Sequence, residues 1–395
     1  MKCLLHITWL FPKKASFLGI SFFIAIAHFL SPIIAKAEDK RPSKDLERSY
    51  QPNNLQTPHG IINLEKPHQP SPPQNSQIHA FKKKPAAPKP FWKVVNDYFT
   101  QPMPEHWFNG TMNEEFPTMA KQGMFELEPY FMGTTPLAQI NNNGKWGKTS
   151  GSPNVFENSW FFEYGITDRL SFEITPSFNT EWGNQSGKGS YTSFNDLPVE
   201  LLYNLFGTSN PSLNLYVGFQ APTGNYQNES STDAGSGWGT WFFNFGLQSQ
   251  WSFLVSKHHV LNVAFWGLAN QSTGNVHISG ISSTYGTDTG FNGTGSASQF
   301  GSEGIGLEYS LWSRKATIAC DLFESWVAPI HTTGYEANGT YVNNKSQWSQ
   351  TFTVEPEFEY SFTEHLGLLV GLEITAAGRN TTAGLTPEFA LNAVY

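Results

Sequence analysis

The feature that most constrains this chain is a strict alternation of apolar and polar residues, which recurs from residue 123 to residue 395. Along residues 352–362, for example, Phe, Val, Pro, Phe, Tyr and Phe alternate with Thr, Glu, Glu, Glu and Ser. Successive side chains of a β-strand point to opposite faces of the sheet. Alternation this regular therefore indicates a sheet with a different solvent on each face.

Twelve such runs follow one another, most of them 10 to 14 residues long, and a tilted strand needs about 9–11 residues to cross a bilayer. The runs are 123–132, 155–166, 169–181, 194–205, 212–221, 238–255, 259–270, 301–312, 315–327, 348–361, 366–376 and 385–395. Short connections alternate with long polar ones, as short periplasmic turns and long extracellular loops do in outer-membrane barrels. We therefore predict an all-β fold: a transmembrane, antiparallel, up-and-down β-barrel of about 12 strands over residues 123–395.

The composition agrees with a membrane barrel and excludes two other classes. Charged residues make up 14% of the chain, against about 25% in a typical soluble protein. The mean hydropathy of -0.36 is too low for a bundle of membrane helices, and an aromatic content of 15% is too high for a chain disordered throughout. A soluble β-sandwich is the remaining alternative, but it gives no reason for a continuous outward face of Phe, Trp and Leu.

The first residues have the pattern of an export signal. Lys13 and Lys14 precede an apolar stretch over 17–35, and Ala35-Lys36-Ala37 supplies a small-x-small cleavage site. We predict a signal peptide over 1–37 that is removed before Glu38; an uncleaved anchor helix is the alternative. The mature protein would then lie in the outer membrane of a Gram-negative bacterium.

Two segments separate this signal from the barrel. Residues 38–90 are rich in Pro, Gln, Asn and Lys without apolar periodicity, so we expect a disordered periplasmic linker. Residues 91–122 are aromatic, with Trp92, Val95 and Phe99 at helical spacing. This second segment is interpreted either as a short amphipathic helix at the barrel mouth or as a plug inside the barrel.

The last strand and the tryptophans carry further membrane signals. Phe389, Leu391, Ala393 and Tyr395 place an apolar residue at every second position up to the end of the chain, as in strands that the outer-membrane assembly machinery recognises. Tryptophans prefer the two membrane interfaces, so we expect two girdles that contact outer-membrane lipid and lipopolysaccharide. The outer girdle would contain Trp182, Trp238, Trp326 and Trp348, and the inner one Trp251 and Trp312.

Several short motifs add a family resemblance over about residues 121–395. They are Phe-Asn-Asp-Leu at 194–197, Gln-Ala-Pro-Thr-Gly-Asn-Tyr at 220–226, and the turn Tyr-Gly-Ile-Thr-Asp-Arg-Leu-Ser at 164–171. Together they resemble the outer-membrane β-barrel, transporter-like family associated with the meta-pathway of phenol degradation, although Phe194-Asn195 departs from its usual glycines. The resemblance implies a barrel for the uptake of aromatic or other hydrophobic compounds.

Acidic residues dominate the polar face of the predicted strands. Residues 121–395 contain 10 basic and 23 acidic side chains, and the basic ones are confined to turns, loops and strand ends. The predicted inward-facing acids are Glu126, Glu128, Glu157, Glu163, Glu173, Asp196, Glu200, Glu308, Asp321, Glu355, Glu357, Glu359, Glu373 and Glu388. A lumen with these walls would be wet and would attract cations, unless the acids are simply paired with polar partners or with the plug.

Glu355, Glu357 and Glu359 form the sharpest part of this pattern, because they lie ~7 Å apart along one wall. Like charges this close destabilise one another unless a cation lies among them. That cation could be a Lys of the basic linker, a calcium ion or an amine-bearing solute.

These observations predict an outer-membrane channel or transporter for small solutes, either hydrophobic and aromatic compounds or cations. The alternative is an adhesion or structural protein that acts through its long loops, above all loop 271–300. Enzymatic activity is not expected, because His258, His259, His277 and His365 lie in turns and loops without a recognisable Ser–His arrangement. No phosphate loop, nucleotide fingerprint, metal-ligand motif or nucleic-acid pattern is present, so we expect no cofactor, no metal and no nucleic-acid partner.

Overall fold

A computed structural model describes residues 102–113, 119–149, 151–183, 191–206, 210–229, 235–311 and 314–395, all within one compact unit, Asn96–Tyr395. The predicted signal peptide, the linker, residues 91–101 and Trp312 lie outside the described residues. No helix among the described residues is long and apolar enough to cross a membrane.

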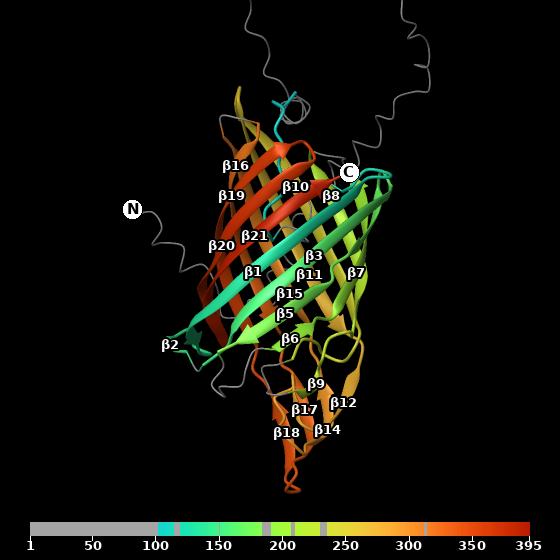
Figure 1. Cartoon of the computed structure of the whole chain (residues 1–395), viewed down its shortest axis with the longest axis vertical. Helices are drawn as coiled ribbons and strands as arrows, with labels where there is room; N and C mark the ends of the chain where they lie inside the picture. Colours follow the sequence, from blue (N-terminus) through green and yellow to red (C-terminus); the bar gives the residue numbers. More distant parts are fainter. Residues whose placement is uncertain are drawn as a thin grey trace, which may run out of the picture. The chain divides into compact units, whose positions relative to one another are not determined.

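Twelve antiparallel strands form a closed barrel, which confirms the predicted fold class (Figure 1). Its strands are β1 (Phe125–Ile140), β3 (Asn154–Thr167), β4 (Leu170–Ile174) continued by β5 (Ser177–Trp182), β6 (Tyr191–Phe194) continued by β7 (Leu197–Phe206), β8 (Ser212–Ala221), β10 (Phe242–Ser256), β11 (His259–Ser272), β15 (Phe300–Ser310), β16 (Ala316–Val327), β19 (Ser349–Thr363), β20 (Leu366–Arg379) and β21 (Thr381–Val394). Each strand pairs with its neighbours in sequence, and β1 pairs with both β3 and β21 to close the ring. A short strand, β2 (Trp146–Lys148), extends β1.

The two faces of the wall are polar inside and apolar outside, the reverse of a soluble protein. On β19, Glu355 and Glu359 are fully buried, whereas Phe352 and Phe358 are 38% and 43% exposed. The same alternation runs along β20 and β21. An apolar outer face is stable only against lipid, and the closed ladder leaves no strand edge to satisfy there.

The last residue of the chain closes the barrel seam. The backbone N–H of Tyr395 donates to the Phe125 carbonyl at 2.8 Å, and the N–H of Phe125 donates to the Tyr395 carbonyl at 2.6 Å. Phe389 is 38% and Tyr395 73% exposed on the outer face. This pair lies at the short-turn end of the seam, which continues along β1 and β21 to Ile140 and Thr381 (Figure 1).

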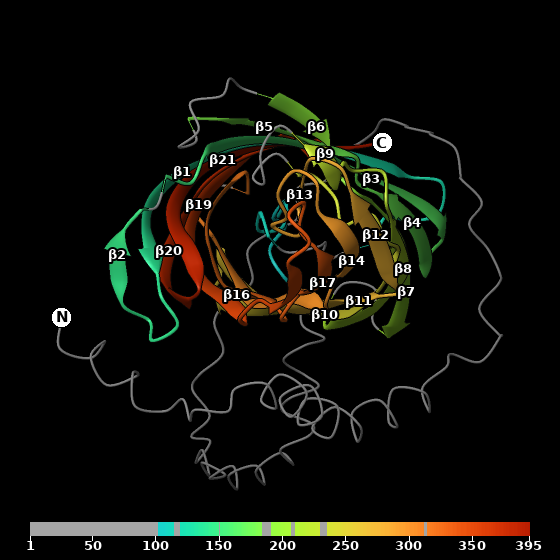
Figure 2. The ribbon, with the colours of Figure 1, turned by 90° about the horizontal axis from the view of Figure 1, so that it is seen from below.

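At the opposite end, the long loops fold into a small cap (the cap is residues 222–229, 235–241, 273–299 and 328–348). Its strands are β12 (Asn275–Ser279), β14 (Asn292–Ser296), β17 (His331–Tyr335) and β18 (Tyr341–Lys345) in one sheet, and β9 (Gln227–Glu229) with β13 (Ser282–Ser283) in another. Val276, Ile278, Tyr285 and Phe291 form its buried core against Phe242 of the wall. Seen along the barrel, β12, β13, β14 and β17 lie over part of its opening (Figure 2).

Candidate functional site

Residues 102–113 of the aromatic segment (the plug segment, hereafter) lie inside the barrel, where Figure 2 shows them as a cyan coil. Four of its backbone N–H groups donate to carboxylates of the wall. The pairs are Asn109 to Glu359 at 3.1 Å, Gly110 to Glu308 at 3.2 Å, Met112 to Glu357 at 3.0 Å and Asn113 to Asp321 at 2.9 Å. The wall acids therefore satisfy a coil whose own backbone would otherwise lack partners.

Side chains of the plug segment reinforce these bonds. The Thr111 hydroxyl donates to Asp321 at 2.7 Å, and the Asn113 amide donates to Glu355. The Asn109 amide donates to Glu359 at 3.3 Å and to the Ser361 hydroxyl at 3.2 Å. Met112 supplies an apolar contact, with Leu369 and Ala390 of the wall. Polar contacts thus dominate the docking of this segment.

Two glycines of β20 make room for the plug segment. A Cβ added at Gly367 would lie 2.1 Å from the Asn109 Oδ1 atom, and one added at Gly371 would lie 2.8 Å from the Met112 sulfur. At Gly371 the Glu355 Oε1 atom would be closer still, at 2.3 Å. Real Cβ atoms do not approach other atoms this closely, so a larger residue at either place would have to displace side chains of the plug segment or of Glu355. In the sequence these residues are simply two members of an alternating strand, and nothing there shows what they face.

A second set of contacts anchors the plug segment at the short-turn end. The Arg314 guanidinium carbon lies over the Trp107 ring, 4.4 Å from the ring centroid, and the Lys315 ammonium lies 5.6 Å from the same centroid. Arg314 also pairs with Glu105 at 2.9 Å. Cation–π contacts of partly exposed groups are modest, about 0.5–1 kcal/mol each, but they fix where the segment enters.

His106 lies beside this anchor, and its Nε2 atom is 2.9 Å from the Thr317 hydroxyl. Burial, with a smaller contribution from the nearby His259, lowers the pKa of His106 to about 4. The docked segment therefore favours the neutral imidazole.

Most of the acids predicted to line the lumen are buried, and Glu157 and Glu373 are half-buried. The buried ones are Glu126, Glu128, Glu163, Glu173, Asp196, Glu200, Glu308, Asp321, Glu355, Glu357, Glu359 and Glu388. In the strand register, Glu126, Glu163, Glu173 and Glu200 stand directly opposite one another on four consecutive strands. The tertiary fold thus turns acids that are scattered in sequence into a continuous row.

Several of these acids accept hydrogen bonds from protein groups, as in the paired alternative to a wet lumen that the sequence leaves open. Asn392 donates to both Glu126 and Glu128, and the backbone of Ala120 donates to Glu163 at 3.0 Å. Asn244 donates to Glu200 at 3.0 Å. Amide side chains of the wall and the backbone of Ala120, which precedes β1, therefore hydrogen-bond these acids.

The tryptophans predicted to form girdles fall into two groups. Trp326 and Trp348 stack at 5.3 Å near the long-loop end, Trp182 is 43% exposed there, and Trp251 lies near the short-turn end of β10. Trp238 does not belong to an outer girdle: it precedes β10 and packs against the cap core, with its ring 6.0 Å from that of Tyr285. The alternating pattern places a strand at 238, but the wall begins only at Phe242, because residues 235–241 cover the barrel mouth.

Asp196 holds the cap to the wall. Its carboxylate accepts the backbone N–H groups of Gly224 at 2.9 Å and Trp238 at 2.8 Å. It is therefore a structural latch as well as a member of the acidic set. The Tyr285 hydroxyl donates to the Trp238 carbonyl at 2.7 Å, and burial raises the pKa of this phenol above its ordinary value.

A cavity of about 370 Å³ lies beside this latch. The wall is interrupted here, since β4 gives way to β5 after Ile174 and β6 gives way to β7 after Phe194. The lining of the cavity combines acids, amides and aromatic rings, namely Glu157, Asn179, Asp196, Gln220, Trp238 and Phe300. The volume and mixed lining are typical of small-molecule sites.

The histidines considered for catalysis lie in three places, with His258 and His259 adjacent at the turn between β10 and β11. His258, His277 and His365 are exposed, and His365 lies next to Glu364. His259 stacks on Tyr309, and its Nδ1 atom is 2.8 Å from the Ser310 carbonyl. His258 contacts a serine hydroxyl only through its backbone N–H, which donates to Ser256 at 3.3 Å, and no hydrogen bond within the described part of the chain joins an imidazole of the four to a serine hydroxyl.

No protein-family model matches the chain, and no curated protein matches it. The chain is similar to the crystal structure of the COG4313 outer membrane channel from Pseudomonas putida F1, with 16% identity and a TM-score of 0.53, over 72% of this chain and 100% of that one. It is also similar to the deltaS2S3 variant of the TodX monoaromatic hydrocarbon channel (11% identity, TM-score 0.37, 70% and 90% covered) and to the transport unit of the autotransporter AIDA-I from Escherichia coli (10%, 0.37, 73% and 92%). At these identities only the first likeness is informative, and it shows the fold alone: an outer-membrane β-barrel. The predicted resemblance to the phenol-degradation family stays a prediction.

Proposed function

We propose that this protein is an outer-membrane channel for small solutes whose lumen is occluded by the plug segment. One observation carries the proposal: a polar lumen is filled by a coil that hydrogen bonds hold in place, with little apolar packing. Hydrogen bonds to carboxylates can be exchanged for bonds to water at a modest net cost, about 1.5–3 kcal/mol each. We therefore propose that the segment is displaced stepwise, as water or solute replaces its hydrogen bonds one at a time.

The acids and the cavity beside Asp196 favour a class of solute. No Lys or Arg lines that cavity, and acids stand in a row along the wall below it. A surface of this charge attracts cations and repels anions. With Trp238 and Phe300 as apolar contacts, the proposed solutes are small molecules that carry a positive charge or hydrogen-bond donors, aromatic amines among them.

The remaining assignments follow from this proposal. The barrel lies in the outer membrane, its apolar face against lipid and lipopolysaccharide, with the short-turn end in the periplasm and the cap outside. The final strand, with its outward Phe389 and Tyr395, engages the assembly machinery. A channel of this kind needs no cofactor and has no enzymatic activity.

The test is permeation through proteoliposomes and planar bilayers. The mature protein is compared with a variant that lacks residues 102–113, and a variant that lacks residues 337–339 of the cap is the matched control. The first deletion should speed swelling in sugars and amino acids and raise conductance, with reversal potentials that show cation preference. That preference should fall in the Glu355→Gln, Glu357→Gln, Glu359→Gln triple variant. Impermeability of both the mature protein and the plug deletion, or anion preference, contradicts the proposal.

A surface-binding role is the second candidate, and one feature of the cap favours it. Tyr335 and Tyr341 are each 57% exposed and form a T-shaped pair on β17 and β18, which project beyond the barrel (Figure 1). Exposed tyrosines of this kind are common at protein contacts. Replacing both with Ser should abolish adhesion of cells that display the protein and leave conductance unchanged; unchanged adhesion rejects this role.

A further inference from the structure

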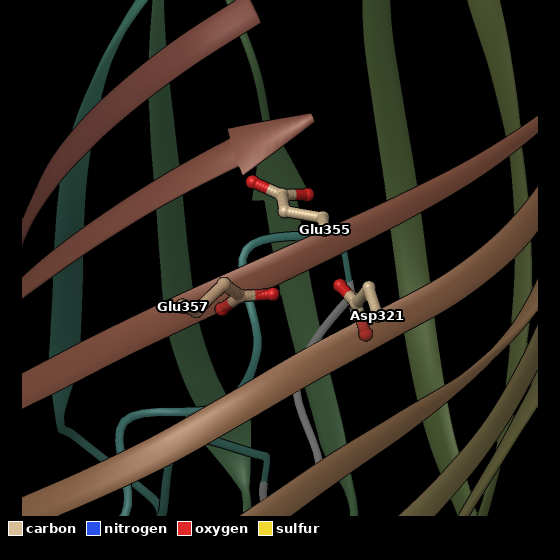
Figure 3. A group of neighbouring side chains, drawn as sticks. All are labelled: Asp321, Glu355 and Glu357. Carbon is tan, nitrogen blue, oxygen red and sulfur yellow. The ribbon is translucent and has the colours of Figure 1, made fainter. Parts of the chain in front are cut away.

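Five carboxyl groups of the wall meet in one place beside the plug segment. Asp321 of β16 stands directly opposite Glu355 of β19 in the strand register, and Glu357 follows on the same face. One oxygen from each of these three residues lies within 4.8 Å of the other two (Figure 3). Glu355, Glu373 and Glu388 form a second group under the same limit. Like charges directly opposite each other in a ladder destabilise it unless something neutralises them.

Two of these carboxylates have an oxygen without a partner. Glu355 is 0% and Glu357 6% exposed, and the Oε1 atom of each is buried and accepts no hydrogen bond. The other oxygens are used by the Asn113 amide and the Met112 N–H. Leaving a buried carboxylate oxygen unpaired is costly, because it loses its water and receives nothing in exchange.

No basic side chain compensates this cluster in the described part of the chain. The ion pairs there are Arg314 with Glu105 and His365 with Glu364, and both are exposed. Two means of neutralisation are left. One is a shared proton, since Asp321 and Glu357 lie within hydrogen-bonding reach of each other. The other is a metal ion among the oxygens.

We propose that Asp321, Glu355 and Glu357 bind a divalent cation of the calcium type, with the Thr111 hydroxyl of the plug segment at its edge. Carboxylate and hydroxyl oxygens are the ligands that such hard cations take. Ca²⁺ accepts several protein oxygens in a flexible geometry, whereas Mg²⁺ is usually held by one or two carboxylates and keeps several of its waters. Three neighbouring carboxylates and a hydroxyl therefore agree better with Ca²⁺.

Uncompensated buried charge gives the site its affinity. A cation would neutralise the opposed carboxylates of Asp321 and Glu355, compensate the two carboxylates that have an unpaired oxygen, and link the wall to Thr111 of the plug segment. Cation binding at this site does not depend on which solute crosses the membrane. It can therefore be tested independently of the proposed channel function.

The experiment is calorimetric titration of CaCl₂, and separately of MgCl₂, into the full mature protein. The protein is refolded without lipopolysaccharide, stripped with EDTA and held in a neutral detergent at pH 7.5. We expect one saturable site that prefers Ca²⁺ over Mg²⁺ and raises the unfolding temperature. Glu357→Gln and Asp321→Asn should each weaken Ca²⁺ binding at least about tenfold, because affinity follows the number of charged ligands. Glu200→Gln is the control, since it removes a buried wall acid that bonds Asn244 outside the cluster.

Three results would overturn the proposal. The first is the absence of Ca²⁺ binding by the unmodified protein at millimolar concentration, which would leave the shared proton as the means of neutralisation. The second is equal weakening by Glu200→Gln and Glu357→Gln, which would indicate general attraction to an acidic wall. The third is Mg²⁺ binding as tight as Ca²⁺ binding. The first and third results are measured on the unmodified protein, so they do not depend on whether a variant folds.

Discussion

The contact between Asn109 and Gly367 allows the docking of the plug segment to be tested from both sides. Asn109→Ala removes the side-chain hydrogen bonds of this residue: its amide donates to Glu359 at 3.3 Å and to Ser361 at 3.2 Å, and the Ser361 hydroxyl lies 3.4 Å from its Oδ1 atom. All of these contacts are long, so we expect a loss near the lower end of the usual range, about 2 kcal/mol together. The undocked population should then rise about thirtyfold. Gly367→Ala acts on the same contact by placing a methyl group 2.1 Å from Asn109 Oδ1, an overpacking that costs about 1–3 kcal/mol.

The double variant separates this contact from general damage. The Asn109→Ala variant lacks the three side-chain atoms that the new methyl group would meet, so Gly367→Ala should add little in that background. The two effects should therefore be non-additive by at least about 1 kcal/mol. The assay is the open probability of single channels in planar bilayers. Gly133→Ala is the matched control, because a Cβ there meets nothing within 4 Å.

Two outcomes would refute this reasoning. If Gly367→Ala leaves the open probability unchanged while the barrel folds, the plug segment does not rest on β20. If the effects of Asn109→Ala and Gly367→Ala simply add, the two residues act at separate places.

Three further predictions address other parts of the molecule. Trp107→Ala should raise the open probability about three- to tenfold, because the contacts of the ring with Arg314 and Lys315 are lost. Trp107→Phe keeps an aromatic ring and should raise the open probability less. Equal currents through the two variants would reject the role of Trp107 as an anchor. The pKa of His106 is lowered to about 4 in the docked segment, so between about pH 6.5 and pH 4 the undocked imidazole is protonated and the docked one is not. Docking should therefore weaken, and conductance rise, as pH falls through this range. His106→Gln should flatten this pH dependence of the conductance. Asp196→Asn leaves one backbone N–H of the cap without an acceptor and should lower the stability of the cap by about 1–3 kcal/mol. Hydrogen exchange should then become faster in the cap but not in β16 or β19. An equal increase in exchange rate in all of these elements would argue against a local role of Asp196.

The sequence predicts most of the fold because a transmembrane strand has to alternate along its whole length. The run at 212–221 matches β8 residue for residue, and those at 259–270 and 366–376 lie within β11 and β20. The last run begins at 385, whereas β21 begins at Thr381, because residues 381–384 pair with β1 beyond the apolar stretch. The cap is the main difference: its strands are built largely from Gly, Ser, Thr and Asn, and nothing in that composition distinguishes a folded cap from irregular loops.

The candidate site is determined only in part by local pattern. The sequence shows which acids face inward, since that follows from alternation, and it predicts the chemistry of Glu355, Glu357 and Glu359 as a set. It does not show that Asp321 lies opposite Glu355, or that Asn109 and Gly367 touch across 258 residues of chain, because strand register and the path of a coil depend on contacts that are distant in sequence. The sequence alone thus determines that one face of the barrel wall is apolar and the other polar. The tertiary structure alone decides what fills the lumen, since a plug is held by the sum of many weak polar contacts and leaves no periodic signal of its own.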